Sequence, residues 1–177
     1  MFRRDLTGPM THLVEADCLE ALWPAAISLV ETAGYAALSL AEISPRYGPL
    51  WAKSSMYETW LYTYATEGFH AVDPLLLGAI AGQREMRLQT GPLWPAAAEN
   101  LKGQAMNDAL ADIGYHQFDA MTFARPDSDN RTLVVLVSHT PSSKPEPPQA
   151  RASRQLLMST LAVGLHRIGA GDDGGFL

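Results

Sequence analysis

Residues 133–137 read Leu-Val-Val-Leu-Val, an apolar run between polar residues on both sides. β-Branched residues favour strands, and successive side chains of a strand point to opposite faces of its sheet. A strand with no polar face must be covered on both sides. We therefore expect a strand over 132–138, with other structure packed on each face of its sheet.

Helix and strand patterns along the rest of the chain supply those layers. Apolar residues spaced three and four apart predict helices, and short apolar or alternating runs between turn signals predict strands. Pro24 is expected to kink or divide the first helix and Gly34 to end it. Expected helices are 11–32, 57–69, 75–86, 96–112 and 151–168; expected strands are 35–43, 51–56, 115–123 and 132–138; residues 141–150, with four prolines, are expected to be a linker or extended loop. Three or four antiparallel strands with helices on both faces predict an α/β/α sandwich around a central antiparallel sheet.

Composition bounds the kind of protein. The chain has 177 residues, enough for one domain with a sizeable core, and 47% of them are hydrophobic. A net charge of -6 lacks the basic footprint of a nucleic-acid binder. Cys18 is the only cysteine, which fits a reducing compartment, and its apolar helical pattern predicts a buried thiol. Without a signal peptide or membrane-spanning run, we expect a cytoplasmic protein.

Residues 60–74 place three polar-tipped side chains in the pattern W-x3-Y-x4-F-x3-D-P. Trp60 and Tyr64 are four apart, so on a helix they share one face. Asp73-Pro74 should end that helix, because proline lacks an N–H and constrains the preceding residue. An indole N–H, a phenol and a carboxylate brought together can orient a small ligand with an amide and carbonyls. The alternative is that the two aromatics are ordinary core residues and Asp73 a turn residue.

The sequence gives no sign of catalytic or metal chemistry. No glycine-rich phosphate loop follows a predicted strand, and no paired carboxylates share a helix face beyond ordinary surface acids. The five histidines show no metal-ligand spacing: His12, His70, His116, His139 and His166. We expect neither an enzyme nor a metal site nor a cofactor.

The motif over 60–74 resembles the autoinducer-binding domain of LuxR-type quorum-sensing regulators. Members of that family follow the motif with a helix ending in glycine, a strand, a turn, a hydrophobic strand and a final helix used for dimerisation. The corresponding places here are Ile113-Gly114, 133–137 and 156–168. The resemblance covers most of residues 10–168, and matches at the level of the motif within 56–74. It implies a domain that binds a signal and controls transcription.

The resemblance also implies a ligand, an N-acyl homoserine lactone, and a role for each polar residue. Trp60 would donate its indole N–H to the lactone carbonyl, Tyr64 would bond the acyl carbonyl, and Asp73 would accept the amide N–H. A carboxylate in a dry pocket needs such a partner. Apolar walls would bury the acyl tail, contributing about 0.8 kcal/mol per CH₂. The wall residues we expect are Met56, Leu75, Leu77, Leu136 and Tyr47.

Three positions depart from the family pattern. The family's second tryptophan falls on Leu88 here, and Trp94 follows six residues later, where it would either substitute as a ligand contact or simply pack. The family's second glycine is Phe118, whose bulk predicts a smaller pocket. The serine or threonine that often faces the ligand from the strand is Leu136.

The last helix and the C-terminal stretch bear on partners. A stripe on that helix is expected to be core, dimer interface or both: Leu157, Leu161, Gly164, Leu165 and Ile168. We expect a sensor domain over 1–170 and a flexible tail or linker stub over 171–177, without a helix-turn-helix domain. Two hypotheses remain open: a sensor segment that forms homodimers, or a stand-alone anti-activator that pairs with a full-length LuxR-type receptor, with or without ligand. Neither predicts nucleic-acid or membrane binding by this chain.

Overall fold

The computed structural model describes residues 6–91, 100–126, 128–141 and 145–168. Trp94 and the predicted tail 171–177 lie outside these ranges. Within them, five antiparallel strands form one sheet in the order β2-β1-β5-β4-β3. The strands are β1 (Ala37–Ser44), β2 (Gly48–Ser54), β3 (Glu85–Gln89), β4 (Gln117–Ala124) and β5 (Arg131–Ser138). The apolar run 133–137 lies in β5, the central strand, and this strand is covered on both faces, as predicted.

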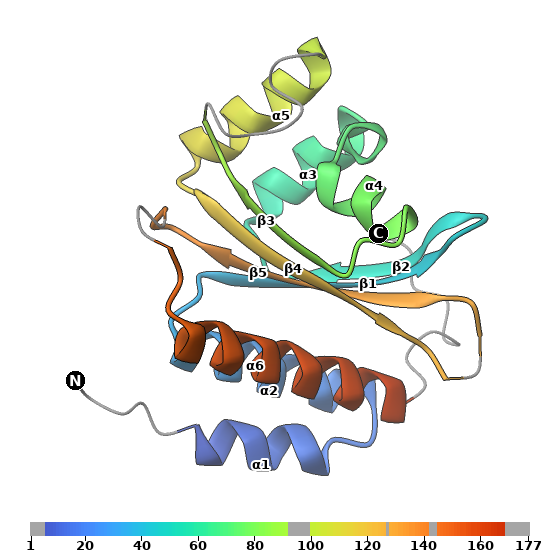
Figure 1. The fold of residues 1–177 in the computed structure, drawn as a ribbon, viewed down its shortest axis with the longest axis vertical. Helices are drawn as coiled ribbons and strands as arrows, with labels where there is room; N and C mark the ends of the chain where they lie inside the picture. The colour runs from blue at the N-terminus through green and yellow to red at the C-terminus, as the bar shows by residue number, and fades with distance from the viewer. Residues whose placement is uncertain (1–5, 92–99, 127, 142–144, 169–177) are drawn as a thin grey trace.

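Helices cover both faces of this sheet, which confirms the predicted α/β/α sandwich (Figure 1). On one face lie α1 (Thr7–Glu15), α2 (Leu19–Ala33) and α6 (Pro148–Arg167). On the other lie α3 (Glu58–Thr66), the short 3-10 helix η1 (Phe69–Ala71), α4 (Pro74–Ile80) and α5 (Leu101–Asp112). None of the described helices is long and apolar enough to cross a lipid bilayer.

Strand β5 supplies both hydrophobic cores. Leu133, Val135 and Val137 face the α3–α5 side, whereas Val134 and Leu136 face α1, α2 and α6. The stripe on α6 belongs to the second core: Leu161 and Leu165 are buried there, and Leu157 and Ile168 pack against it. A Cβ added to Gly164 would meet Leu22 at 3.1 Å. The stripe is therefore core, and dimerisation stays a prediction from the resemblance.

Two of the predicted helices divide or end early. The first predicted helix divides between Glu15 and Leu19, and α2 continues through Pro24, because its apolar face is buried along the whole length. Cys18 lies in the resulting break and is exposed, so the expected buried thiol is wrong. The predicted helix 75–86 ends at Ile80, and residues 85–89 form the additional edge strand β3.

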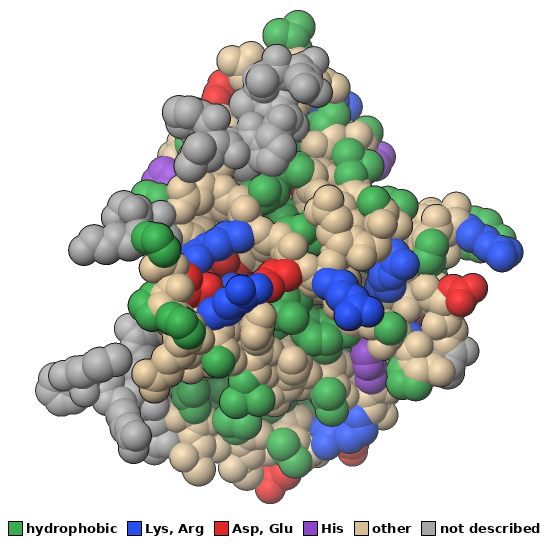
Figure 2. All heavy atoms as spheres, in the orientation of Figure 1, with side chains coloured by type: hydrophobic (Ala, Val, Ile, Leu, Met, Phe, Trp, Pro, Cys, Tyr) green, Lys and Arg blue, Asp and Glu red, His purple; other side chains and the backbone are tan. Residues whose placement is uncertain are grey.

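A network of charged side chains ties α6 to strands β3 and β4 (Figure 2 shows acidic and basic side chains interleaved on this face). Its centre is Arg154, only 4% exposed, whose guanidinium donates to Glu146 at 2.8 and 3.0 Å and to Glu85 at 2.9 Å. Asp119 of β4 lies 3.1 Å from Arg87 and 3.8 Å from Arg154. These contacts hold the N-terminal half of α6 over β3 and β4.

Candidate ligand-binding site

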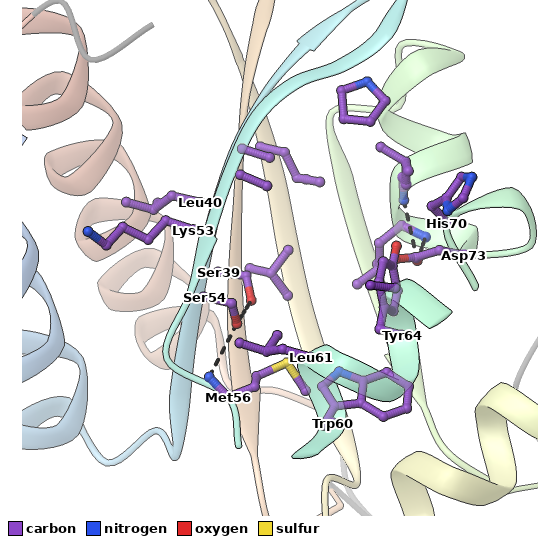
Figure 3. A pocket seen from close by; sticks show the side chains of 18 of the residues that line it. Ser39, Leu40, Lys53, Ser54, Met56, Trp60, Leu61, Tyr64, His70 and Asp73 are labelled. Atoms are coloured by element: carbon purple, nitrogen blue, oxygen red, sulfur yellow. Dashed lines mark hydrogen bonds between the residues drawn. The ribbon is translucent and has the colours of Figure 1, made fainter. Parts of the chain in front are cut away.

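A cavity of about 290 Å³ lies between the sheet and the layer of α3, α4 and α5. Its volume is near the lower end of small-molecule sites, which run from about 300 to 1,000 Å³. The sheet wall carries small side chains from β1 and β2, and the helical wall carries larger aromatic and aliphatic ones (Figure 3). The cavity exists because the small residues leave room that larger ones would fill: Ser39, Ala41, Ala52 and Ser54.

Asp73 lies on the helical wall with both carboxylate oxygens bonded. Oδ1 accepts the backbone N–H groups of Leu75 at 2.8 Å and Leu76 at 3.4 Å, which makes Asp73 the N-cap of α4. Oδ2 accepts the Tyr64 hydroxyl at 2.9 Å. Pro74 is the first residue of α4, where a missing N–H costs little. Asp73-Pro74, predicted to end one helix, therefore begins the next one.

Trp60 lies beside this pair and is 4% exposed. Its ring meets Tyr64 edge-on at 5.8 Å and stacks on Phe69 at 5.8 Å between centroids. This packing fixes the rings, and the indole nitrogen lies on the edge nearer the cavity (Figure 3). Within the described part of the chain, the indole N–H has no hydrogen-bond acceptor.

Burial sets the charge state of the acid and the phenol. Burial raises the pKa of Asp73, and the hydrogen bonds from Tyr64, Leu75 and Leu76 oppose that rise. Burial and then the charge of Asp73 raise the pKa of Tyr64. The phenol therefore stays protonated and donates to the carboxylate. Asp73 still has lone pairs for one further donor, because each carboxylate oxygen accepts two hydrogen bonds.

The motif residues come together as the sequence predicted, but only some of the predicted wall residues line the cavity. Met56 and Leu75 line the cavity with Trp60, Tyr64 and Asp73. The other three predicted wall residues are wrong. Leu136 lies on the opposite face of the sheet, because its neighbours in β5 face the cavity. The side chains of Tyr47 and Leu77 are 81% and 46% exposed. Trp94 lies outside the described residues.

Phe118 and Leu88 are cross-strand partners in β4 and β3. Phe118 lines the cavity, as expected of a residue that restricts it, and Leu88 packs against the same core. The sequence reasoning missed Ser39 and Ser54, which face the cavity from β1 and β2. Their alternation with Leu38, Leu40 and Lys53 was the available signal, since Leu40 and Lys53 point to the other face (Figure 3).

Helix α4 is held at its C-terminal end as well. The guanidinium of Arg131 on β5 donates to the carbonyls of Ala79 at 3.0 Å and Ile80 at 3.2 Å. Gly82 follows with φ of 87°, and a Cβ there would lie 3.2 Å from the same guanidinium. Both the left-handed backbone and this close approach require glycine.

No group of three His, Cys, Asp or Glu side chains in the described ranges is placed to hold a metal ion. The site instead offers hydrogen-bond donors and acceptors at one end of an apolar space. Such an arrangement orients and buries a small organic molecule.

No protein-family model and no curated protein matches this sequence. Solved structures share its fold. The N-acylhomoserine lactone dependent LuxR family transcription factor CepR2 from Burkholderia cenocepacia has a TM-score of 0.70 at 15% identity, covering 94% of each chain. SdiA from Escherichia coli has a TM-score of 0.72 at 16% identity, covering 97% of this chain and 70% of that one. SdiA in complex with octanoyl-rac-glycerol has a TM-score of 0.71 at 16% identity, covering 100% of this chain and 72% of that one. The chain therefore has the fold of the LuxR-type autoinducer-binding domain that its motif predicted.

Proposed function

We propose that this chain is a signal-binding regulatory domain whose cavity holds an N-acyl homoserine lactone. The convergence of Trp60, Tyr64 and Asp73 on one wall of a largely apolar cavity carries the proposal. CepR2, which shares the fold, is described as dependent on N-acylhomoserine lactone. This ligand carries an amide N–H, two carbonyls and a hydrocarbon tail. These groups match a site with one buried acceptor, polar donors and apolar walls.

In this arrangement Trp60 donates its free indole N–H to the lactone carbonyl, and Asp73 accepts the amide N–H. Tyr64 donates its single hydroxyl proton to the Asp73 carboxylate, at an O···O distance of 2.9 Å. Tyr64 therefore orients the carboxylate, and the acyl carbonyl of the ligand needs a hydrogen-bond donor other than Tyr64. The acyl tail runs along the apolar walls, which include Leu61, Leu133 and Val135.

The direct test is thermal unfolding with a panel of N-acyl homoserine lactones of increasing chain length. A ligand that binds only the folded chain stabilises it by about 2.7 kcal/mol at 100 times its dissociation constant. Octanoyl glycerol belongs in the panel, because SdiA has been solved with it. A melting temperature that no member of the panel changes would contradict the proposed function.

The matched control fills the cavity. Ala41 pairs with Ala52 and with Leu133, and all three line the cavity. Ala41→Leu should place three more carbons in the space the ligand needs. We expect the free variant to melt at least as high as the wild type, because it fills a void. Its response to the lactones should be lost, whereas an equal response in both proteins would place the ligand elsewhere.

Acidification should weaken binding through Asp73. The amide N–H binds the carboxylate better than the acid, because the charge strengthens the bond. Since the pKa of Asp73 lies above 3.8, affinity should fall at a higher pH than an ordinary aspartate would give. In the free protein the sign is opposite: a raised pKa means that Asp73 contributes most stability below 3.8 and loses it as pH rises.

Calorimetric titrations from pH 7.5 down to the lowest pH at which the protein stays folded measure this dependence. Asp73→Asn should give weak binding with a flat pH profile. His70, which also lines the cavity, is replaced by glutamine as a control, and that variant should keep the wild-type profile. A flat profile in the wild type would contradict the role of Asp73.

A further inference from the structure

Two hydroxyl groups lie on the sheet wall, across the cavity from Asp73 (Figure 3). Ser39 of β1 and Ser54 of β2 are cross-strand partners, so they point to the same face, and their Oγ atoms are 2.7 Å apart. Ser54 Oγ also accepts the backbone N–H of Met56 at 3.2 Å. The pair is a polar spot in a wall whose neighbouring side chains, Ala41 and Ala52, are apolar.

Counting protons shows that this pair has a donor to spare. Two serine hydroxyls carry two protons, and one proton is used in the bond between them. The other contact of the pair uses a lone pair of Ser54, because Met56 is the donor. One O–H proton therefore has no acceptor among the residues that the structure describes, whichever serine carries it.

The same count shows that Tyr64 has no proton left for a ligand. Its only hydroxyl proton goes to Asp73. Among Trp60, Tyr64, Asp73 and the serine pair, the groups available to a ligand are then two donors, the Trp60 indole and one serine hydroxyl, and the acceptor Asp73; the ring of His70 also lines the cavity. An N-acyl homoserine lactone presents the complement: two carbonyl acceptors and one N–H donor.

The geometry of an amide decides which carbonyl the serines meet. In a trans amide the N–H and the C=O point in opposite directions. A ligand that gives its N–H to Asp73 on the helical wall therefore directs its acyl carbonyl toward the sheet wall, where Ser39 and Ser54 lie. Trp60 is on the helical side with Asp73, which leaves it for the lactone carbonyl.

We propose that the Ser39–Ser54 hydroxyl pair donates the hydrogen bond to the acyl carbonyl of the bound lactone. This inference rests on the proposed function and replaces the role that the resemblance assigned to Tyr64. Tyr64 becomes a positioning residue for Asp73, and the serine pair becomes the part of the site that selects an amide carbonyl.

The test compares a carbonyl with a thiocarbonyl at the same place in the ligand. The probes are the lactone of the panel with the largest thermal shift and its thioamide analogue, because sulfur is a weak hydrogen-bond acceptor. Calorimetry gives the affinity of both probes for the wild type, Ser39→Ala, Ser54→Ala and the double variant. The double variant should bind the carbonyl probe about tenfold more weakly than the wild type.

The ratio of the two affinities separates a ligand contact from a structural effect. We expect the double variant to lose most of the wild-type preference for the carbonyl over the thiocarbonyl, and each single variant to lose less, because one hydroxyl remains. Ser55→Ala is the matched control, since Ser55 bonds the backbone of Leu38 and does not line the cavity. It should leave the ratio unchanged.

Each outcome bears on one claim. A double variant that binds measurably and keeps the wild-type ratio would overturn the serine assignment while the proposed function stands. Loss of binding to both probes in equal proportion, with an unfolded circular dichroism spectrum, would show a structural role and would also overturn it. Failure of the wild type to bind any lactone would contradict the proposed function itself.

Discussion

Replacing Arg154 by methionine is expected to lower the free energy of unfolding by about 3–5 kcal/mol, because it breaks a buried ionic network by removing one partner. Methionine retains much of the apolar stem of arginine, so the lost free energy of unfolding measures the contribution of the guanidinium group. Glu146 would lose its hydrogen bond from Arg154 at 2.8 Å, and Glu85 would lose the one at 2.9 Å. Asp119, 2% exposed, would keep its ion pair with Arg87 and the hydrogen bond from Gln117 at 2.9 Å.

Urea unfolding at pH 7 measures the change, and Arg151→Met is the matched control. Arg151 also pairs with Glu85, but its side chain is 56% exposed, and exposed pairs contribute little to stability. We expect a small effect of Arg151→Met beside a large one of Arg154→Met. Equal effects would show that the buried guanidinium has no special role.

The difference between wild type and Arg154→Met should shrink in acid. The hydrogen bond from Arg154 is the largest cause that lowers the pKa of Glu146, and Arg151 and Arg154 lower that of Glu85. A lowered pKa means that the stability from these carboxylates is present above 4.5 and is lost as pH falls through the lowered value. The variant lacks most of that contribution and so has less to lose.

The second large effect is expected at Asp73, where one side chain supports both the fold and the ligand. Asp73→Ala removes the N-cap of α4, at a cost of about 0.5–2 kcal/mol, and leaves the Tyr64 hydroxyl without its acceptor, at about 1–3 kcal/mol. Because Asp73 is buried with a raised pKa, part of this loss is offset. We expect the free energy of unfolding to fall by about 1–4 kcal/mol.

Asp73→Asn separates the two roles. The amide oxygen can still accept from Leu75 and Leu76, so most of the stability should remain, but the NH₂ group opposes the ligand N–H. We expect the affinity for the lactone to fall about a hundredfold, since a buried donor is left unpaired. Asn100, which caps α5 through Lys102 at 2.8 Å and does not line the cavity, is the control. Asn100→Ala should lower stability without changing affinity, and an Asp73→Asn protein with wild-type affinity would contradict the role of the acid.

The layered fold was predictable because its signals are local. The run 133–137 has no polar face, so a strand covered on both faces followed directly. The edge strand β3 was missed because residues 75–86 also fit a helical pattern. Glycine at position 82, with φ of 87°, and the alternation of Glu85, Arg87 and Gln89 with apolar neighbours were the signals against it.

The site was predictable only for residues that lie close together in one segment of the sequence. Trp60, Tyr64 and Asp73 come from residues 60–73, so their meeting follows from helix geometry and a turn. The face of Leu136 does not follow in this way, because both faces of β5 are apolar and only packing against α2 and α6 distinguishes them. Ser39 and Ser54 meet through the register of two strands, which single-residue patterns do not specify.

The contact between Tyr64 and Asp73 shows a further reason why roles are harder to predict than positions. The sequence brought the phenol and the acid to the same place, but a hydroxyl has one proton, and its direction depends on which acceptor is nearer. The carboxylate is that acceptor. A role carried over from a resemblance therefore needs a count of protons at the actual site.

Helix α4 has only seven residues, too few for a helix to persist alone in water. Asp73 holds its first turn and Arg131 its last carbonyls, and these residues belong to different layers of the molecule. This part of the cavity wall is therefore held at both of its ends by side chains that lie outside the helix. A molecule that binds Asp73 contacts the residue that caps α4, so filling the cavity and stabilising the first turn of this helix are linked.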